Sequence, residues 1–383
     1  MVRVAVLGAG PTGLEAALAA HQRGWDVTVY EAAPHVGAYV RQWGHVRLFT
    51  PWSMNISPRA AAALGLPDHG TCPTGNEYAE HLEQVAALLP DVRLSTTVEQ
   101  VARQGLLKSE EIGSDTRGAT PFLLLVTGPD GQEALETADV VLDCTGTYGN
   151  PNPTGDGGIP ALGEGSCAAL IVRTIPAVDA TWAGRRVLLV GAGNSAQTVA
   201  RDLTTVGAEL TWAVRGTDPT WGAVEADPLP DRVTLVESSR ALAAGGVVQT
   251  GVVVQALRRQ DEQVAVTLRD AGGATRDVVV DVVVSMTGAV GNSRIYRQLQ
   301  VHECYATEGP ITLAATLLGS EGGDCLVQTS AGVDVLRNPE PRFFVLGSKS
   351  YGRNNTFLLR IGWEQVAEVF GALDDELLAG ARN

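Results

Sequence analysis

Two glycine-rich turns have the residue types and spacing that could support chemistry. The first, GAGPTG at 8–13, follows a short apolar run. Gly8 permits a tight turn out of a strand, Gly10 lets the backbone approach a pyrophosphate, and Gly13 lets a helix pack closely on the strand. The N–H groups of the first helical turn, which includes Thr12, offer partial positive charge to phosphates. The spacing therefore predicts a dinucleotide site.

The second turn, GAGNSA at 191–196, has alanine in place of the third glycine, which the dinucleotide pattern tolerates. Gly191 and Gly193 correspond to the first two glycines, and Asn194 and Ser195 open the next helix. One such turn is weak evidence, because a glycine-rich turn can bind nothing. Two of them, each between a strand-like and a helix-like run, predict two dinucleotide sites.

The residue that ends the second strand of each unit differs in charge. Glu31 follows the first turn, and a carboxylate there accepts hydrogen bonds from both ribose hydroxyls and repels a 2′-phosphate. Arg215 takes the equivalent place after the second turn, where a guanidinium pairs with a 2′-phosphate and favours NADPH over NADH. Arg185 and Arg186 add to this charge or are plain surface charges.

Each turn lies within a predicted strand–helix–strand unit. The expected segments are 2–7, 14–22 and 26–30 in the first unit and 187–190, 195–206 and 209–214 in the second. Further helices are expected at 76–89 and about 356–373, and further strands at 92–94, 122–127, 138–145, 264–269, 277–285 and 343–346. The strands 264–269 and 277–285 read as a hairpin. The chain is thus expected to be an α/β protein with two Rossmann-like dinucleotide-binding domains.

The composition limits the possible partners. The chain has 383 residues, is 45% hydrophobic and carries a formal net charge of −15. This acidity argues against binding to nucleic acid or to an anionic membrane. No apolar run is long enough to span a bilayer, and the glycines at 8–13 break the superficial likeness of the N-terminus to a secretion signal. The expected partner is a small-molecule substrate, and nothing in the sequence indicates an oligomeric state.

The cysteines predict no disulfide framework and no metal site. Their number is odd and their spacings are irregular: Cys72, Cys144, Cys167, Cys304 and Cys325. Reduced thiols are typical of a cytoplasmic protein, which is the expected localisation. The sequence has no C-x-x-C pair to exchange electrons with a flavin, which argues against dithiol–disulfide chemistry.

At this point the sequence resembles the flavoproteins with two dinucleotide-binding domains, and among them the flavin-containing and N-hydroxylating monooxygenases. The resemblance covers most of the chain. Its carriers are GAGPTG at 8–13, PTGNEYAEHL at 73–82, CTGTYGNPN at 144–152, GRRVLLVGAGNSA at 184–196, MTG at 286–288 and KSYGRNNTFLLRIGWEQV at 349–366. Two departures stand out: the F-x-G-x-x-x-H segment of flavin-containing monooxygenases is missing before the second turn, and Ser348-Lys349 follow Gly347 where many disulfide reductases have Gly-Asp.

The resemblance implies a discontinuous FAD-binding domain, 1–155 and 285–383, with an NADPH-binding domain, 156–284, inserted in it. The final helix would return to the flavin, with its N-terminus near Asn354-Asn355-Thr356 directed at the pyrimidine ring. Partial positive charge there would stabilise an anionic reduced flavin. FAD and NADPH are the implied cofactors.

Two segments supply candidate active-site residues. In resembling enzymes the loop 43–58 passes alongside the flavin, which makes Trp43, Arg47, Trp52 and above all Asn55 candidates for flavin or substrate contact. The C-terminal loop adds Lys349, Tyr351, Arg353, Asn354 and Asn355, a set that suits a flavin carbonyl or an anionic substrate. The alternatives are that the Trp side chains only pack the loop and that the C-terminal residues are solvated. His302, Glu303 and Tyr305 form a small titratable cluster outside both glycine turns that lines the substrate pocket or, as is favoured, has no role in it. Cys144 is expected in the core.

The expected function is a FAD-dependent oxidoreductase reduced by NADPH, and specifically a monooxygenase that N- or S-oxygenates a small substrate through a flavin C4a-hydroperoxide. The cations Arg47, Lys349, Arg353 and Arg360 would gather near the flavin and favour an anionic substrate, unless Lys349 and Arg353 only pair with surface acids. Two alternatives remain open: an NADPH:acceptor reductase without oxygen insertion, and a non-catalytic redox-sensing flavoprotein.

Overall fold

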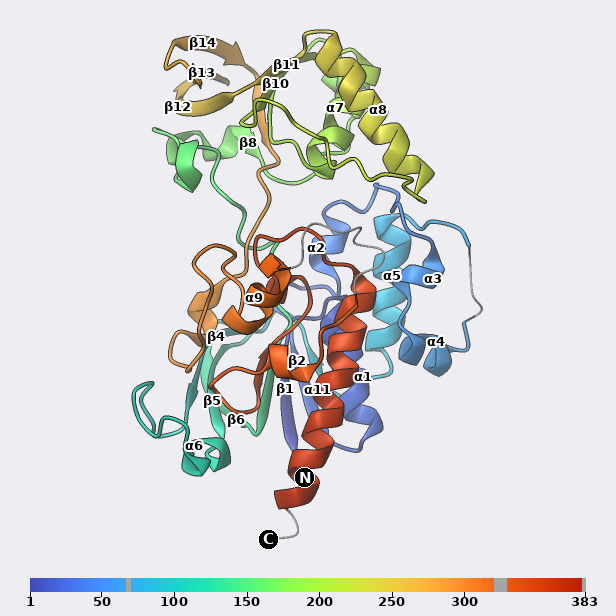
Figure 1. The fold of residues 1–383 in the computed structure, drawn as a ribbon, viewed down its shortest axis with the longest axis vertical. Coiled ribbons are helices and arrows are strands. Elements are labelled where there is room, and N and C mark those ends of the chain that lie inside the picture. Colours follow the sequence, from blue (N-terminus) through green and yellow to red (C-terminus); the bar gives the residue numbers. More distant parts are fainter. Residues whose placement is uncertain (67–69, 320–328, 381–383) are drawn as a thin grey trace. The chain divides into compact units, whose positions relative to one another are not determined.

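The chain forms two units, each built around one parallel sheet (Figure 1). The computed structural model describes residues 1–66, 70–319 and 329–380. Unit 1 comprises Met1–Asn150 and Val290–Asn383, and unit 2 comprises Pro151–Ala289. Among the described residues each unit has a five-stranded parallel sheet and a three-stranded antiparallel sheet. The predicted α/β class with two Rossmann-like sheets is confirmed, and the antiparallel sheets are an addition to it.

The parallel sheet of unit 1 has the strand order β16-β7-β1-β2-β3, and its antiparallel sheet the order β4-β5-β6. The strands are β1 (Arg3–Leu7), β2 (Asp26–Tyr30), β3 (Val92–Arg93), β4 (Thr97–Arg103), β5 (Phe122–Thr127), β6 (Glu133–Ala138), β7 (Val140–Asp143) and β16 (Phe343–Val345). The helices are α1 (Pro11–Gln22), α2 (Ala38–Arg41), α3 (Trp52–Asn55), α4 (Pro58–Leu64), α5 (Gly75–Ala86), α6 (Asp115–Ala119), α9 (Ile311–Gly319), α10 (Val333–Leu336) and α11 (Leu359–Gly380).

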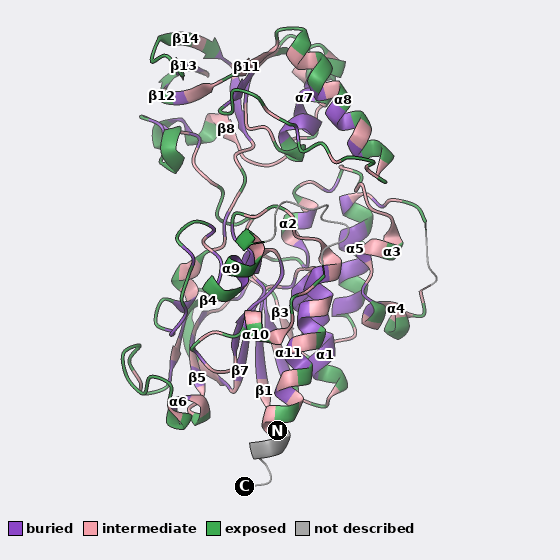
Figure 2. Ribbon diagram, viewed as in Figure 1, coloured by how far each residue is buried: buried purple, intermediate pink, exposed green. Residues whose placement is uncertain are grey.

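The parallel sheet of unit 1 is buried on both faces, as the near-continuous apolar strands require (Figure 2). Val4 and Val6 of β1 point into a core formed with α1, α5 and α11. Their neighbours Ala5 and Leu7 point to the other face, where they pack with the antiparallel strands β4 and β5. The alternation of side chains along β1 therefore produces three layers: helices, parallel sheet and antiparallel sheet.

Unit 2 repeats this plan. Its parallel sheet has the order β11-β10-β9-β15-β8 and its antiparallel sheet the order β12-β13-β14. The elements are β8 (Ile171–Val172), β9 (Arg186–Val190), α7 (Asn194–Val206), β10 (Glu209–Val214), α8 (Pro230–Ala244), β11 (Val248–Thr250), β12 (Val252–Gln260), β13 (Gln263–Asp270), β14 (Thr275–Val280) and β15 (Val282–Ser285). Helices α7 and α8 share one core with the parallel sheet, and the antiparallel strands share the other.

Each unit has its own Arg–Asp ion pair at the amino end of the central strand of its parallel sheet. Arg3 opens β1 and donates its backbone and side-chain N–H groups to Asp139, which lies just before β7. Arg186 opens β9 and does the same with Asp281, just before β15. Arg186 thus stands at the end of β9 opposite the glycine turn, which settles it as a structural charge, while Arg185 stacks on Trp182.

Two expected elements are wrong in detail. The segment 277–285 is not one hairpin strand: β14 pairs antiparallel with β13, and β15 then joins the parallel sheet beside β9. Both parts are apolar and β-branched, so the sequence pattern did not show the break at Asp281. The final helix begins at Leu359 rather than near Thr356. The expected loop after β2 contains the two short helices α2 and α3.

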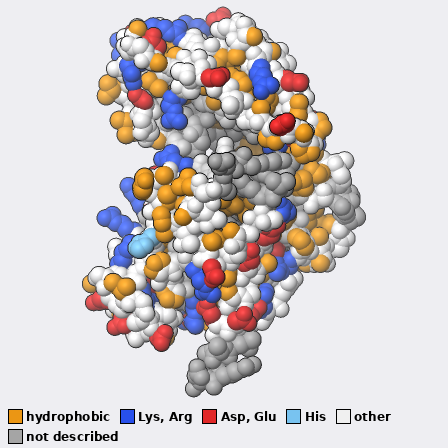
Figure 3. Space-filling model, viewed as in Figure 1, with side chains coloured by type: hydrophobic (Ala, Val, Ile, Leu, Met, Phe, Trp, Pro, Cys, Tyr) orange, Lys and Arg blue, Asp and Glu red, His pale blue; other side chains and the backbone are white. Residues whose placement is uncertain are grey.

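Three further features of the described residues are their surface charge, their helix lengths and the arrangement of side chains that could bind a metal. On the face in Figure 3, acidic and basic side chains are interspersed rather than gathered into one basic patch. Across the described ranges, no helix has the length and apolar character needed to cross a membrane. Within the same ranges no group of His, Cys, Asp and Glu side chains is arranged to hold a metal ion.

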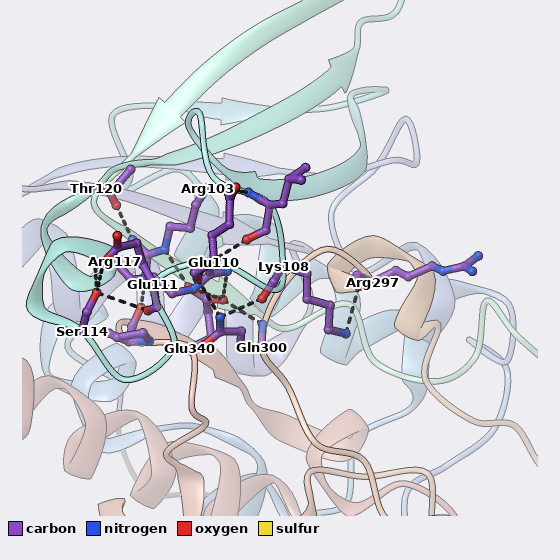
Figure 4. A network of polar contacts seen from close by, with 12 residues as sticks. Arg103, Lys108, Glu110, Glu111, Ser114, Arg117, Thr120, Arg297, Gln300 and Glu340 are labelled. Atoms are coloured by element: carbon purple, nitrogen blue, oxygen red, sulfur yellow. Dashed lines mark hydrogen bonds and ion pairs between the residues drawn. The ribbon is translucent and has the colours of Figure 1, made fainter.

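A buried ion network ties the antiparallel sheet of unit 1 to the segment that leads into β16 (Figure 4). Arg103 and Arg117 both donate to Glu340, at 2.7 Å each, and all three side chains are almost completely buried. The backbone N–H of Gln300 also donates to Glu340. Burial alone would raise the pKa of Glu340, but the bonds from Arg117, Gln300 and Arg103 hold it below the usual 4.5. The network lies at the amino end of β16, away from the glycine turn.

We expect Glu340→Leu to lower the free energy of unfolding by about 3–5 kcal/mol, because it leaves two buried guanidinium groups without a counter-ion. Since the pKa of Glu340 is depressed in the folded protein, its contribution is present above pH 4.5 and is lost as the pH falls through the folded value. Urea unfolding at pH 7 measures the first effect. The matched control is Glu376→Leu, which removes a half-exposed pair with Arg337 and should cost less than about 1 kcal/mol. Equal losses in both variants would contradict the assignment.

Candidate cofactor and active site

The first glycine turn has the geometry of a phosphate cradle. Gly8 adopts a positive φ of 99°, and a β-carbon there would lie 2.8 Å from the carbonyl oxygen of Cys144. A β-carbon on Gly13 would overlap the carbonyl oxygen of Gly8. Gly10, by contrast, faces open space, since no described atom lies within 4 Å of its ideal β-carbon position. No side chain caps α1 at Gly10, so its first N–H groups can receive an anion.

The second turn repeats these features in unit 2. Gly191 has a φ of 121°, and a β-carbon there would overlap the carbonyl oxygen of Met286. Gly193 faces open space and begins α7 without a side-chain cap. Asn194 and Ser195 form the first turn of α7. In the first turn both Gly8 and Gly13 lie against backbone atoms, while in the second Gly191 does so and Ala196 replaces the third glycine. Each turn leaves its middle glycine open, which suits a pyrophosphate.

The charged residues at the strand ends differ in their surroundings. Glu31 accepts hydrogen bonds from the N–H groups of Ala9 and Ala33, at 2.8 and 2.9 Å, so its carboxylate is held against the first turn. Each of its oxygens keeps a second lone pair for a ribose hydroxyl. Arg215 is exposed, and its guanidinium makes no ion pair with the residues that the structure describes. It is thus available to an anionic ligand.

The loop 43–58 lies partly against α5. Trp52 packs its ring near Tyr78 and His81, so its role is packing. Trp43 is half-buried, and its indole N–H has no hydrogen-bond partner among the described residues. Arg47 donates to the carbonyl of Cys72 and remains exposed. An orphaned buried donor such as that of Trp43 is a candidate contact for a bound cofactor.

Asn55 lies beside the first turn of α1, because it lines the same small cavity as Pro11 and Leu14. Its side chain is buried, and both N–H groups of its amide donate to the carbonyls of Thr50 and Pro51. The amide oxygen accepts from the Thr50 hydroxyl and keeps one acceptor position. Asn55 is therefore well ordered, and only its oxygen remains able to bind a further donor.

Lys349 does not lie in an anion-binding loop, and this corrects the sequence expectation. Its ammonium group donates to Asp143 at 2.6 Å, to the Thr145 hydroxyl at 3.0 Å and to the carbonyl of Asn292 at 2.8 Å. The Lys349 and Asp143 side chains are almost fully buried. All three ammonium protons are thus used inside the protein, where they join the ends of β7 and β16 to the chain returning from unit 2.

Two of the other expected cations have carboxylate partners, while Arg47 donates to the carbonyl of Cys72. Arg353 pairs with Glu308 at 2.9 Å, and Arg360 with Glu364 at 2.7 Å. The predicted gathering of cations in excess is therefore not seen, and the charge argument for an anionic substrate fails. Asn355 is exposed, while Thr356 is half-buried and bonds to the Asn354 side chain ahead of α11.

The remaining candidate residues differ in burial. Cys144 is buried beside the first turn, as expected. Tyr351, which was expected in a polar or solvated loop, is instead buried against Phe357. His302 and Tyr305 are exposed, and Glu303 accepts a hydrogen bond from Tyr296. The described cysteines are free thiols: Cys72, Cys144, Cys167 and Cys304. Cys325 lies outside the described residues.

Sequence reasoning missed two buried acids next to the first turn. Asp143 ends the apolar strand β7, and Glu15 is 4% exposed within the apolar helix α1. Their signal in the sequence is a lone carboxylate inside an otherwise apolar element, VVLD at 140–143 and LEAALAA at 14–20. A buried carboxylate needs a cationic or hydrogen-bonding partner, so this signal indicates that a contact exists but does not name the partner.

Valine at Gly10 or Gly193 tests the two cradles separately. Both glycines have extended backbone that valine adopts, and both face open space, so we expect the variants to fold as the wild type does. Gly10→Val fills the first cradle, and the protein should purify without FAD. Gly193→Val should keep its FAD and lose about tenfold or more in the rate of flavin reduction by NADPH. Flavin absorbance and stopped-flow reduction measure these effects, and loss of FAD in both variants would refute separate sites.

The comparisons with known proteins agree with this geometry. A family model described as an NAD(P)-binding Rossmann-like domain matches residues 6–62. An indole-3-pyruvate monooxygenase of Oryza sativa subsp. japonica is 27% identical over 216 residues, 55% of this chain and 47% of that protein. Dimethylaniline monooxygenase (N-oxide-forming) 4 of Rattus norvegicus is 25% identical over 228 residues, 56% of this chain and 38% of that protein. The chain thus spans less than half the length of these curated relatives.

Solved structures share the whole fold. The bacillithiol disulfide reductase of Bacillus cereus superposes with a TM-score of 0.68 at 19% identity and covers 98% of this chain and 99% of that one. The ornithine N-hydroxylase of Kutzneria sp. 744 has a TM-score of 0.63 at 14% identity and covers 98% and 99%. The chain therefore contains a segment that matches an NAD(P)-binding Rossmann-like domain, is similar over about half of its length to two monooxygenases, and shares the fold of a disulfide reductase and of an N-hydroxylase.

Proposed function

We propose that this protein is a FAD-dependent oxidoreductase reduced by NADPH, with FAD bound by unit 1 and NADPH by unit 2. The observation that carries the proposal is the pair of matching cradles, each with an open glycine at an uncapped helix N-terminus. Their strand-end charges are opposite, Glu31 in unit 1 and Arg215 in unit 2. Only the second accommodates a 2′-phosphate. The proposed FAD contacts are Gly8, Gly10, Thr12, Gly13, Glu31, Trp43, Arg47 and Thr356, and the proposed NADPH contacts are Gly191, Gly193, Asn194, Ser195 and Arg215.

Within that class, the proposed reaction is oxygenation of a small nucleophilic nitrogen or sulfur compound. Both curated relatives are monooxygenases, and the sequence has no C-x-x-C pair of the kind that cycles between dithiol and disulfide. Bound FAD would supply hydride acceptance and oxygen activation. One NADPH, one proton and one O₂ would convert the substrate to its oxide, with NADP⁺ and water as the other products.

The protein's own residues would bind and orient the reacting groups. The Asn55 oxygen, which accepts from the Thr50 hydroxyl, would accept one further donor near the first turn of α1, and Arg353 and Asn355 stand in the loop before α11. We propose these three as the residues that contact the reacting groups. The half-exposed pair of Arg353 with Glu308 can open at little cost, so Arg353 remains able to bind a ligand.

A second candidate is an NADPH:acceptor reductase that inserts no oxygen. The observation in its favour is the fold likeness to bacillithiol disulfide reductases, which covers nearly the whole chain. Such a reductase would return its electrons to an acceptor rather than to O₂. The two candidates therefore differ in what the reduced protein does in air.

Arg215→Ala tests the choice of nicotinamide cofactor. The substitution removes an exposed charge, so the fold should be unchanged, while the KM for NADPH should rise about tenfold or more because a charge-assisted contact to the 2′-phosphate is lost. The KM for NADH should stay within about twofold, since NADH has no such phosphate. Steady-state flavin reduction with both cofactors gives the comparison. Arg185→Ala is the matched control, because that side chain stacks on Trp182.

Anaerobic reduction by NADPH followed by mixing with O₂ separates the two candidates. A monooxygenase should return to the oxidised spectrum through a long-lived, spectrally distinct species, because a water-poor site protects it. In the presence of a nucleophilic amine or sulfide, ¹⁸O from ¹⁸O₂ should appear in the product. Direct reoxidation with stoichiometric peroxide and no labelled product would favour the reductase, and failure of NADPH to reduce the flavin would reject both.

A further inference from the structure

Helix α1 contains a buried carboxylate, that of Glu15, whose side-chain partners lie outside the helix. Glu15 lies in the apolar stretch LEAALAA and its side chain is only 3% exposed. It accepts a hydrogen bond from the Ser57 hydroxyl at 2.6 Å and forms an ion pair with Arg59. A buried carboxylate without such partners would be strongly destabilising, so these contacts are required by its position.

Both partners belong to the segment that begins at Asn55. Ser57 accepts the N–H of Ala60 and so caps α4, while its hydroxyl proton goes to Glu15. Arg59 stands in the first turn of α4 and also donates to Gln22 at the end of α1. The carboxylate of Glu15 thus fastens residues 57–60 to the dinucleotide helix. Asn55, two residues before Ser57, is held by the same attachment.

A small cavity lies at the centre of this arrangement. Its volume is about 10 Å³, which is room for one water molecule, and it is lined by Pro11, Leu14, Glu15, Asn55, Ser57, Ala60, Tyr78, His81, Leu82, Val85 and Trp363. His81 is 6% exposed, and in the described part of the chain it makes ring contacts but no hydrogen bond. Burial lowers the pKa of His81, and Glu15 forms its ion pair with Arg59 rather than with this imidazole.

The charge state of Glu15 follows from its two partners. Burial raises the pKa of Glu15, while the Ser57 hydroxyl and the Arg59 guanidinium oppose that shift. The groups that face it come from each packed element: Ser57 and Arg59 from the start of α4, His81 and Tyr78 from α5, and Trp363 from α11. Arg59 is therefore the cation that balances a Glu15 carboxylate at this place.

We propose that Glu15 is the positioning residue for Asn55: its carboxylate, through Ser57 and Arg59, sets the distance between the Asn55 amide and the first turn of the FAD-binding helix. The proposal rests on the proposed function and deepens it, because it assigns the alignment of a reacting-site residue to the cofactor helix itself. Glu15 does not touch the cofactor or the substrate in this role. It acts on Asn55 through the backbone of residues 55–57.

The test compares Glu15→Leu and Glu15→Gln in the FAD-loaded protein. Glutamine keeps an acceptor for Ser57 and loses the charge opposite Arg59, whereas leucine loses both. The matched control is Glu83→Leu on α5, which breaks the half-exposed ion pair of Glu83 with Arg41 of α2. The first readout is amide hydrogen exchange in residues 50–60, with α7 of unit 2 as the internal reference. The second is peroxide released per NADPH consumed in air.

Glu15→Leu should exchange at least about tenfold faster in residues 50–60 and release several times more peroxide, while FAD content and NADPH-driven flavin reduction stay within about twofold. Glu15→Gln should show a smaller change in both, and Glu83→Leu none. Unchanged exchange in Glu15→Leu would overturn the proposal, as would faster exchange without any change in peroxide release. If the leucine variant does not fold, Arg59→Met gives the same two readouts. Failure of the wild type to be reduced by NADPH would instead reject the proposed function.

Discussion

The structure depends on one close contact in each unit. The glycine that follows β1 or β9 lies against the carbonyl oxygen of the residue that follows the neighbouring strand, β7 or β15. A β-carbon on Gly8 would press on Cys144, and one on Gly191 would press on Met286. These contacts let each helix start directly above its strand, with its N–H groups directed into the open space beside Gly10 or Gly193. Any larger residue at the close contact would push the helix away and close the cradle.

Buried charges then hold the surrounding segments in place. Lys349 and Asp143 join two strand ends to the returning chain, Glu15 holds the Asn55 segment, and Glu340 binds two arginines at the far end of β16. Each acid is desolvated and has at least one cation within bonding distance. These charges are therefore used for internal attachment, and Lys349, one of the cations expected near the flavin, is among them.

The two units share one plan and differ where chemistry would differ. Both have an Arg–Asp pair at the amino ends of their first strands, and both have an antiparallel sheet on one face. They differ at the strand ends, where Glu31 is bound to its own turn and Arg215 is exposed. A carboxylate held by backbone N–H groups is a fixed acceptor, whereas an exposed guanidinium adapts to an incoming phosphate.

The sequence by itself determined the two dinucleotide turns and the strands and helices around them, because glycine spacing and apolar runs are local signals that the backbone must obey. It also showed that Cys144 would be buried. Tertiary structure alone decided the partners of Lys349, Arg353 and Glu15, since these contacts join segments far apart in the chain. It also decided that residues 277–285 divide between two sheets. The physical reason is that pairing depends on which elements pack together, and no local pattern encodes the identity of a distant partner.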